Sequence, residues 1–154
     1  MKLTAGVTLT EFLIVLAIIG ILAGLVGFGA VRSVRSAELR EGATQMATDL
    51  RRARSQAQRG SATTTISWDA GNSTRYLVGG SERRLPGNVT LNCPSNCSGT
   101  GTAGNQVTYT APYGELAGAV GKVLRVSSSF PGLTPLEIRV VGVTGKVIVT
   151  QGGS

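Results

Sequence analysis

The chain has 154 residues, two cysteines, no histidine and a formal charge of +7, from 15 lysine and arginine residues against 8 aspartate and glutamate residues. Its length suits one globular domain with an appendage. Without histidine there is no ordinary Ser-His-Asp or Cys-His arrangement, and the two thiols lack the further ligands that zinc needs. We therefore expect neither an enzyme nor a metal or cofactor site.

The first predicted element is a membrane-spanning helix. No charged residue occurs between Phe12 and Val31, and Glu11 stands just before this run. Twenty helical residues rise about 30 Å, which is enough to cross a hydrocarbon core. A cleaved secretory signal is the competing interpretation, but its apolar region would be shorter and would end at a small-residue cleavage site. Because a basic helical region follows here, we expect the segment to stay in the mature protein.

Helical periodicity continues beyond the apolar run. No proline occurs between Val7 and Arg59, and the sequence Arg59-Gly60-Ser61 is typical of a helix end. Two interpretations are open: one continuous helix, which we favour, or two helices joined near Gly24–Gly29. Apolar residues in the second half recur at steps of three and four, which predicts one buried stripe: Leu39, Ala43, Met46, Leu50, Ala53 and Ala57.

After the helix the apolar period changes to two, which is typical of strands. Two hairpins are predicted, one around DAGNST and one around GVTG at the end of the chain, and the stretch from Asn92 to Asn105 is predicted to be an irregular loop. The fold class is therefore α+β, a long N-terminal helix packed on an antiparallel sheet. The predicted strands are Thr63–Trp68, Tyr76–Val78, Val89–Leu91, Val107–Tyr109, Val123–Val126, Glu137–Val141 and Lys146–Thr150.

The N-terminal sequence GVTLTEFLIVLAIIGIL, residues 6–22, resembles type IV prepilins and type II secretion pseudopilins. The resemblance implies a pilin fold and cleavage by a prepilin peptidase after Gly6. It also implies N-methylation of the new N-terminal residue, Val7, and an assembly contact from Glu11 to the N-terminal amine of a neighbouring subunit. The expected regions are a leader (1–6), a transmembrane and assembly half of the helix (7–31), its amphipathic half (32–59) and a β-rich head (60–154).

Three later segments resemble minor pilins of the GspH/FimT type: TDLRRARSQAQRGSATTTISWD, LPGNVTL and EIRVVGVTGKVIV. The resemblance implies a structural subunit of a type II secretion pseudopilus or a type IV pilus. Its partners would be other pilin subunits and inner-membrane lipid. The C-terminal domain would be periplasmic before assembly into a pseudopilus or a cell-surface pilus. An independent membrane-anchored domain is a further interpretation, in which Glu11 has no partner.

The alternative function is a DNA-binding minor pilin that acts in natural transformation. Clustered arginines between Arg32 and Arg59 attract phosphates, although a solvated helix face or a subunit interface also explains them. Some FimT-like minor pilins bind DNA through a basic C-terminal tail. Here the tail is VIVTQGGS, preceded by Lys146 alone, so that motif is not carried.

Three smaller features have two interpretations each. Gly20 and Gly24 form a GxxxG pattern, which lets helices approach closely in lipid or merely loosens the helix. Cys93 and Cys97 form a disulfide in an oxidising periplasm or stay a reduced pair. Glu11 contacts either a neighbour's amine or its own N-terminus through the helix dipole.

Overall fold

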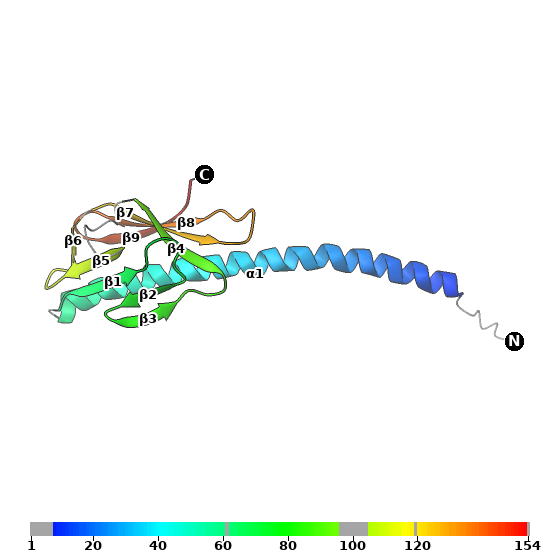
Figure 1. The fold of residues 1–154 in the computed structure, drawn as a ribbon, viewed down its shortest axis with the longest axis horizontal. Helices are drawn as coiled ribbons and strands as arrows, with labels where there is room; N and C mark the ends of the chain where they lie inside the picture. Colours follow the sequence, from blue (N-terminus) through cyan, green and yellow to red (C-terminus); the bar gives the residue numbers. More distant parts are fainter. Residues whose placement is uncertain (1–7, 61, 96–104, 119, 154) are drawn as a thin grey trace. The chain divides into compact units, whose positions relative to one another are not determined.

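The computed structural model of the chain describes residues 8–60, 62–95, 105–118 and 120–153. One helix, α1 (Leu9–Gly60), precedes all the described strands (Figure 1). The strands are β1 (Thr64–Trp68), β2 (Arg75–Val78), β3 (Ser81–Arg84), β4 (Val89–Ser95), β5 (Gln106–Thr110), β6 (Glu115–Ala117), β7 (Lys122–Ser128), β8 (Leu136–Val141) and β9 (Lys146–Gln151).

The helix α1 is continuous from Leu9 to Gly60, so the two-helix interpretation is wrong. It begins at a Thr-x-x-Glu sequence, where the hydroxyl of Thr8 accepts a hydrogen bond from the backbone N–H of Glu11 at 3.3 Å. A side-chain oxygen at this place satisfies one of the N–H groups that have no partner inside the helix. The helix is long and apolar enough to cross a membrane.

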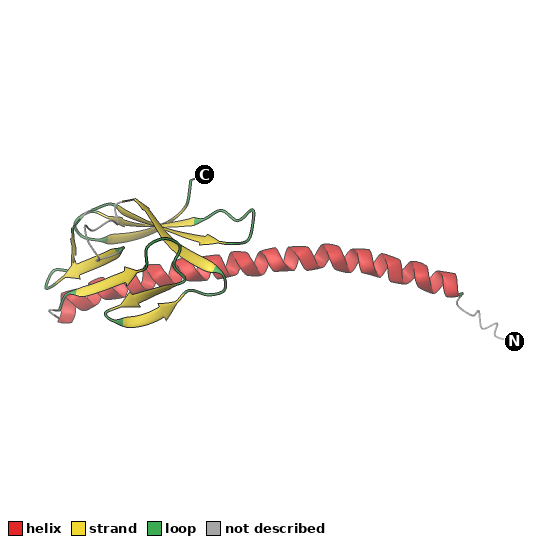
Figure 2. Cartoon of the chain, viewed as in Figure 1, coloured by secondary structure: helices red, strands yellow, loops and turns green. Residues whose placement is uncertain are grey.

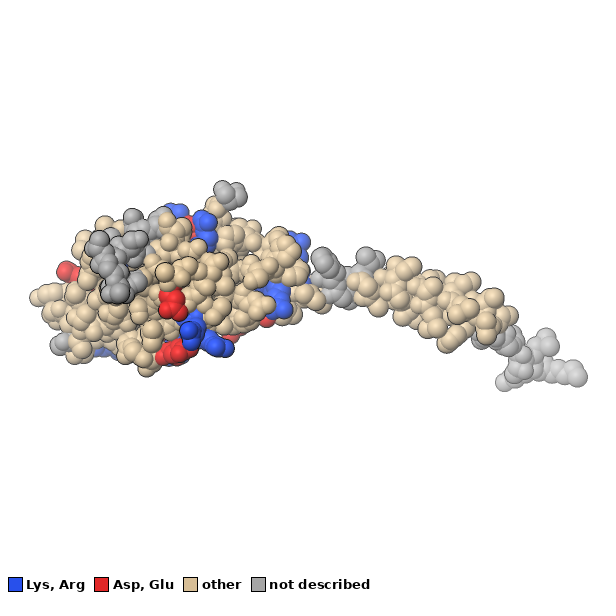
Figure 3. Space-filling view, viewed as in Figure 1, with Lys and Arg blue, Asp and Glu red and all other residues tan. Residues whose placement is uncertain are grey.

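The chain divides into two compact units, residues 1–34 and residues 35–154. In the first unit every large apolar side chain between Leu9 and Leu22 is exposed by 48% or more. The part of α1 nearest its N-terminus shows no charged residue on the face drawn in Figure 3. Nothing within the described part of this unit covers its apolar surface.

In the second unit α1 is amphipathic and packs against the strands (Figure 2). The predicted stripe is confirmed, because all six of its residues are buried: Leu39, Ala43, Met46, Leu50, Ala53 and Ala57. They share one hydrophobic core with side chains from both sheets, including Ile66, Tyr109 and Ile138. The predicted α+β class, a long helix on antiparallel strands, is therefore confirmed.

The strands form two antiparallel sheets, a five-stranded one in the order β3-β2-β1-β5-β6 and a four-stranded one in the order β4-β7-β8-β9. Both predicted hairpins are confirmed. In the first, Ile66 of β1 pairs with Val78 of β2, and in the second, Ile138 of β8 pairs with Val149 of β9.

Sequence patterns gave no sign of β3 or β6, and they placed the start of the loop too early. The strand β3 has the sequence SERR and is exposed throughout, so it shows no apolar alternation. It forms because its backbone pairs with β2. The predicted loop from Asn92 to Asn105 is wrong over residues 92–95, since β4 runs to Ser95 and pairs there with Val123 across an irregular register. Long-range pairing overrides local loop composition at this place.

Candidate functional site

The residues predicted to direct processing and assembly lie at the start of the chain. Gly6 and Val7 lie outside the described residues. Glu11 lies in the first turn of α1, where the positive end of the helix dipole favours a carboxylate. Its side chain is exposed, and no ion-pair partner for it occurs among the residues that the structure describes. Both interpretations of Glu11 stay open.

The two glycines of the GxxxG pattern lie on α1 with open space beside them. A Cβ atom added at Gly20 or Gly24 would meet no neighbouring atom within 4 Å. Glycine inside a helix costs about 1 kcal/mol relative to alanine, and no described packing within the chain offsets that cost. These positions are therefore free for close approach by a second helix, which stays a prediction.

The predicted disulfide lies at the edge of the described region. Cys93 is half-buried in β4 and packs against the core. Cys97 lies outside the described residues, so the pairing of the two cysteines stays a prediction.

A polar network joins α1 to β2 and β3 in the second unit. The hydroxyl of Tyr76 donates to Oδ2 of Asp49 at 2.7 Å. The amide of Gln45 donates to that hydroxyl at 3.0 Å and to the backbone oxygen of Arg84 at 2.9 Å. Burial and the bond to Asp49 raise the pKa of Tyr76. Because both partners of the shortest bond are buried, this network fixes the helix on the sheet.

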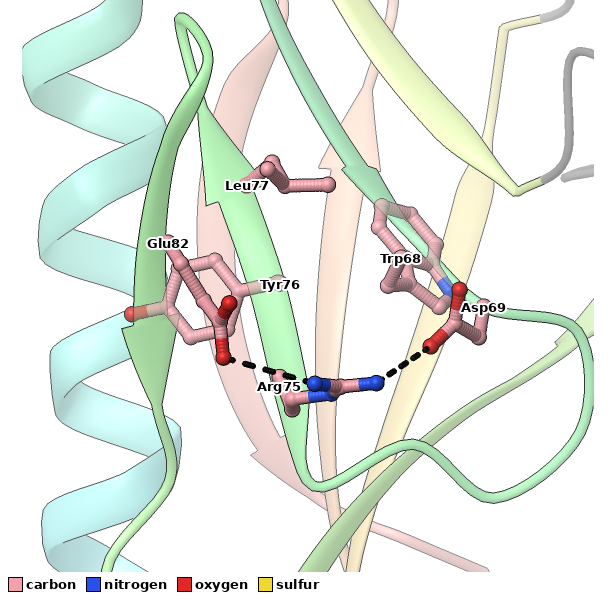
Figure 4. A pocket seen from close by; sticks show the side chains of 6 residues that line it. All are labelled: Trp68, Asp69, Arg75, Tyr76, Leu77 and Glu82. Carbon is pink, nitrogen blue, oxygen red and sulfur yellow. Dashed lines mark ion pairs between the residues drawn. The ribbon is translucent and has the colours of Figure 1, made fainter.

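A small hollow of about 160 Å³ lies beside this network (Figure 4). The guanidinium of Arg75 lies between the carboxylates of Asp69 and Glu82, at 3.9 and 3.7 Å. The indole nitrogen of Trp68 is buried and has no hydrogen-bond partner among the described residues. The carboxylates of Asp69 and Glu82 thus share the charge of Arg75. This arrangement is typical of a contact that stabilises the fold.

Two further charged side chains are buried in or beside the sheets. The ammonium of Lys122 in β7 donates to the backbone oxygen of Gln106 in β5 at 2.7 Å, which ties one sheet to the other, and burial lowers the pKa of Lys122. Glu137 in β8 pairs with Arg125 at 2.9 Å and with Arg139 at 3.1 Å. These two guanidiniums hold the pKa of Glu137 below its usual range.

Four of the predicted arginines of α1 line two hollows. In the first, Arg40 and Arg52 lie with Arg83 of β3 and the acids Glu41 and Asp49, and Arg52 lies 3.9 Å from Asp49. In the second, the charged residues are all cations: Arg51 and Arg54 of α1 and Lys146 at the start of β9. Asp49 is not one of the predicted stripe residues, but it is buried, because Tyr76 supplies its hydrogen bond.

Sequence reasoning did not find the second hollow, because β9 meets α1 about a hundred residues later in the chain. A guanidinium nitrogen of Arg51 donates to the backbone oxygen of Val147 at 3.3 Å across a separation of 96 residues. The sequence feature that could have indicated this hollow is the pair Gly145-Lys146 in the final hairpin turn. Gly145 has a left-handed backbone with φ of 62°, and an added Cβ would stand 2.5 Å from the ring of Tyr109. Glycine at 145 thus lets the turn that carries Lys146 approach the core.

No group of three or more histidine, cysteine, aspartate or glutamate residues with metal-binding geometry occurs in the described part of the chain. The chemistry that the described residues offer to a partner lies in two places. It comprises an apolar helix half with one carboxylate, and a head with separate charged clusters.

Comparisons with known proteins bear on the fold. No protein-family model matches the chain, and no curated protein matches it. Two crystal structures of the type IV minor pilin FimU from Pseudomonas aeruginosa strain PAO1 are similar to it. The first, in space group P21, has a TM-score of 0.58 and 15% identity over 74% of this chain and 89% of that one. The second, in space group P65, has a TM-score of 0.55 and 14% identity over 72% of this chain and 91% of that one. The chain has a type IV pilin-like fold.

Proposed function

We propose that this chain is the precursor of a minor pilin or pseudopilin that is inserted in the inner membrane and assembled into a filament. One observation carries the proposal: the first half of α1 exposes every large apolar side chain between Leu9 and Leu22 and has a single carboxylate, Glu11, in its first turn. An apolar surface of this kind needs lipid or other helices around it. The likeness of the fold to a type IV minor pilin supports the same role.

In this proposal a prepilin peptidase removes residues 1–6, and Val7 becomes the methylated N-terminus. The free amine has an ordinary pKa near 7.7 and is largely cationic. Glu11 neutralises the amine of a neighbouring subunit as the apolar helices leave the lipid and stack. Removing one partner of a buried ion pair costs roughly 3–5 kcal/mol, so this contact would set the register of assembly. The C-terminal domain would then lie in the periplasm and finally on a pseudopilus or a pilus.

The experiment replaces Glu11 by alanine and by glutamine in cells that contain the peptidase and the other subunits. We expect membrane insertion and cleavage to persist in Glu11→Ala and Glu11→Gln, while incorporation into sheared filaments is lost. Glu41→Ala is the matched control, since it removes an exposed carboxylate from the same helix in the second unit, residues 35–154. Normal incorporation of both Glu11 variants would contradict the pairing mechanism.

A second measurement tests the processing step separately. Mass spectrometry of the wild-type protein should find an N-terminus at Val7 that carries one methyl group. In Gly6→Leu the same measurement should find the uncut chain, because the bulky side chain replaces the glycine at the expected cleavage point. A mature N-terminus at any other residue would rule out the prepilin interpretation of the leader.

A further inference from the structure

We propose that Arg51, Arg54 and Lys146 form a binding site for a phosphate group. The three side chains line one hollow of about 310 Å³ together with Ser55, Gln58 and Val147. This volume is at the lower end of ordinary ligand sites. The site lies wholly within the second unit, so it does not depend on the filament proposal.

Charge is the first argument for an anionic ligand. The hollow holds three formal positive charges, and no carboxylate of the described residues lies within ion-pair distance of them. By contrast, Arg125 and Arg139 share the carboxylate of Glu137. Three uncompensated cations that face one hollow repel one another, and a multiply charged anion removes that repulsion.

The geometry supplies the second argument. Arg51 is tied to the backbone of β9 by its 3.3 Å bond to Val147, which fixes the guanidinium and leaves its other donors for a ligand. The Nε atom of Arg54 is buried with no partner among the described residues. Arg54 also lines the hollow, so its guanidinium brings a second planar set of donors beside that of Arg51. The left-handed Gly145 positions the third cation, Lys146, beside them.

Phosphate fits this donor set better than a carboxylate does. A carboxylate has one charge and two oxygens, whereas a phosphate group presents three or four oxygens and up to two charges. Two planar guanidinium forks and one ammonium together match such a tetrahedral group. The phosphate can come from a free phosphate compound or from the backbone of a nucleic acid, and the experiment separates the two sources.

The experiment uses the full chain in neutral detergent and titrates it with inorganic phosphate, with chloride at equal ionic strength as the reference. Calorimetry should find saturable binding to the wild type. Arg51→Gln/Lys146→Gln should weaken it by about tenfold or more, since each bond to a charged group contributes about 1.5–3 kcal/mol. Both replaced side chains are exposed, so we expect folding to persist. Unchanged fluorescence of the buried Trp68 checks this.

The matched control is Arg40→Gln/Arg83→Gln, which removes the same two charges from the hollow that also holds Glu41 and Asp49. It should leave phosphate binding unchanged. A second variant, Arg54→Lys, keeps the charge and loses the planar fork, so it should also weaken binding. Equal loss in the two double variants would show a general attraction and overturn the site. Absence of saturable phosphate binding to the wild type would overturn it as well.

A short DNA duplex then identifies the source of the phosphate. If the source is nucleic acid, the slope of log affinity against log salt should fall by about two in Arg51→Gln/Lys146→Gln and stay unchanged in the control. Phosphate binding without DNA binding assigns the site to a free phosphate compound and retains the proposal. A glutamate-rich peptide serves as the competing carboxylate ligand. If it bound the site more tightly than inorganic phosphate does, the phosphate assignment would be overturned in favour of a carboxylate.

Discussion

The two halves of α1 share one unbroken helical backbone and differ in what covers them. The described residues up to Val34 expose their large apolar side chains, whereas residues 35–60 bury one stripe of them. Helix formation is thus the same in both halves, and the source of stability is different. The second half is stabilised by packing within the chain, and no described residue covers the apolar surface of the first half.

The largest expected effect comes from a leucine in each half. Leu50 is fully buried and Leu16 is 48% exposed. Leu50→Ala should lower the free energy of unfolding of the head by about 2–5 kcal/mol, because it leaves a cavity in the core. Leu16→Ala should change it by less than about 0.5 kcal/mol. Denaturant titration of the full chain, followed by the fluorescence of Trp68, measures both. An equal loss of unfolding free energy in the two variants would contradict the difference between the two halves of α1.

Glycine substitutions in the second unit should differ in the same way from one in the first half of α1. Gly145→Ala places a Cβ against the ring of Tyr109 and forces alanine into a left-handed backbone. These costs are about 1–3 kcal/mol for the overlap and about 1–2 kcal/mol for the backbone. Gly142→Ala is the matched control, because its φ is 67° but its Cβ position is open, so only the backbone cost applies. Thermal unfolding measures all three variants, and Gly20→Ala should leave the stability of the second unit unchanged.

The polar network that holds the second half should show a smaller effect. Tyr76→Phe removes the hydroxyl that bonds to Asp49 and leaves a buried carboxylate with a weaker partner. We expect a loss of about 1–3 kcal/mol. In the double variant with Asp49→Asn the two losses should not add, since they break one interaction. Simple additivity, measured by urea unfolding, would mean that the bond contributes nothing to the packing of α1.

The smallest effect concerns pH. Arg125 and Arg139 lower the folded-state pKa of Glu137. This pair therefore stabilises the head above the unfolded pKa of a glutamate, near 4.3, and the stabilisation is lost as pH falls through the lower folded value. Its size is below about 1 kcal/mol, because both arginines are partly exposed. Glu137→Gln should reduce the acid-dependent part of the unfolding free energy between pH 5 and pH 3, measured at fixed ionic strength (about 0.1 M). An unchanged pH profile would exclude this role for Glu137.

The sequence predicts the local features of this fold well. The continuity of α1 and its buried stripe follow from spacing within a few residues, and the two hairpins follow from glycine-rich turns between alternating segments. What could not be predicted depends on distant partners. Asp49 is a polar residue beside the stripe, and its partner Tyr76 lies 27 residues away. The strand β3 has no apolar alternation, and the cationic hollow needs β9 beside α1.

The residues predicted to direct assembly differ from those of the second unit, because their contacts within the chain do not explain them. Glu11, Gly20 and Gly24 were found through their position in an N-terminal pattern, and within the described residues no contact to another part of the chain shows why they are there. In the proposed filament their partners would belong to other molecules, and the fold of a single chain would not reveal them.

The scarcity of lysine in this basic protein has a practical consequence. Twelve of its fifteen cationic residues are arginine, and the lysines are Lys2, Lys122 and Lys146. Lys2 lies outside the described residues, and Lys122 is buried with its ammonium bonded to a backbone oxygen. Amine-reactive dyes or crosslinkers would therefore modify one described side chain in the folded head, Lys146. Apart from the N-terminal amine and Lys2, such reagents would thus mark the cationic hollow without any engineered cysteine.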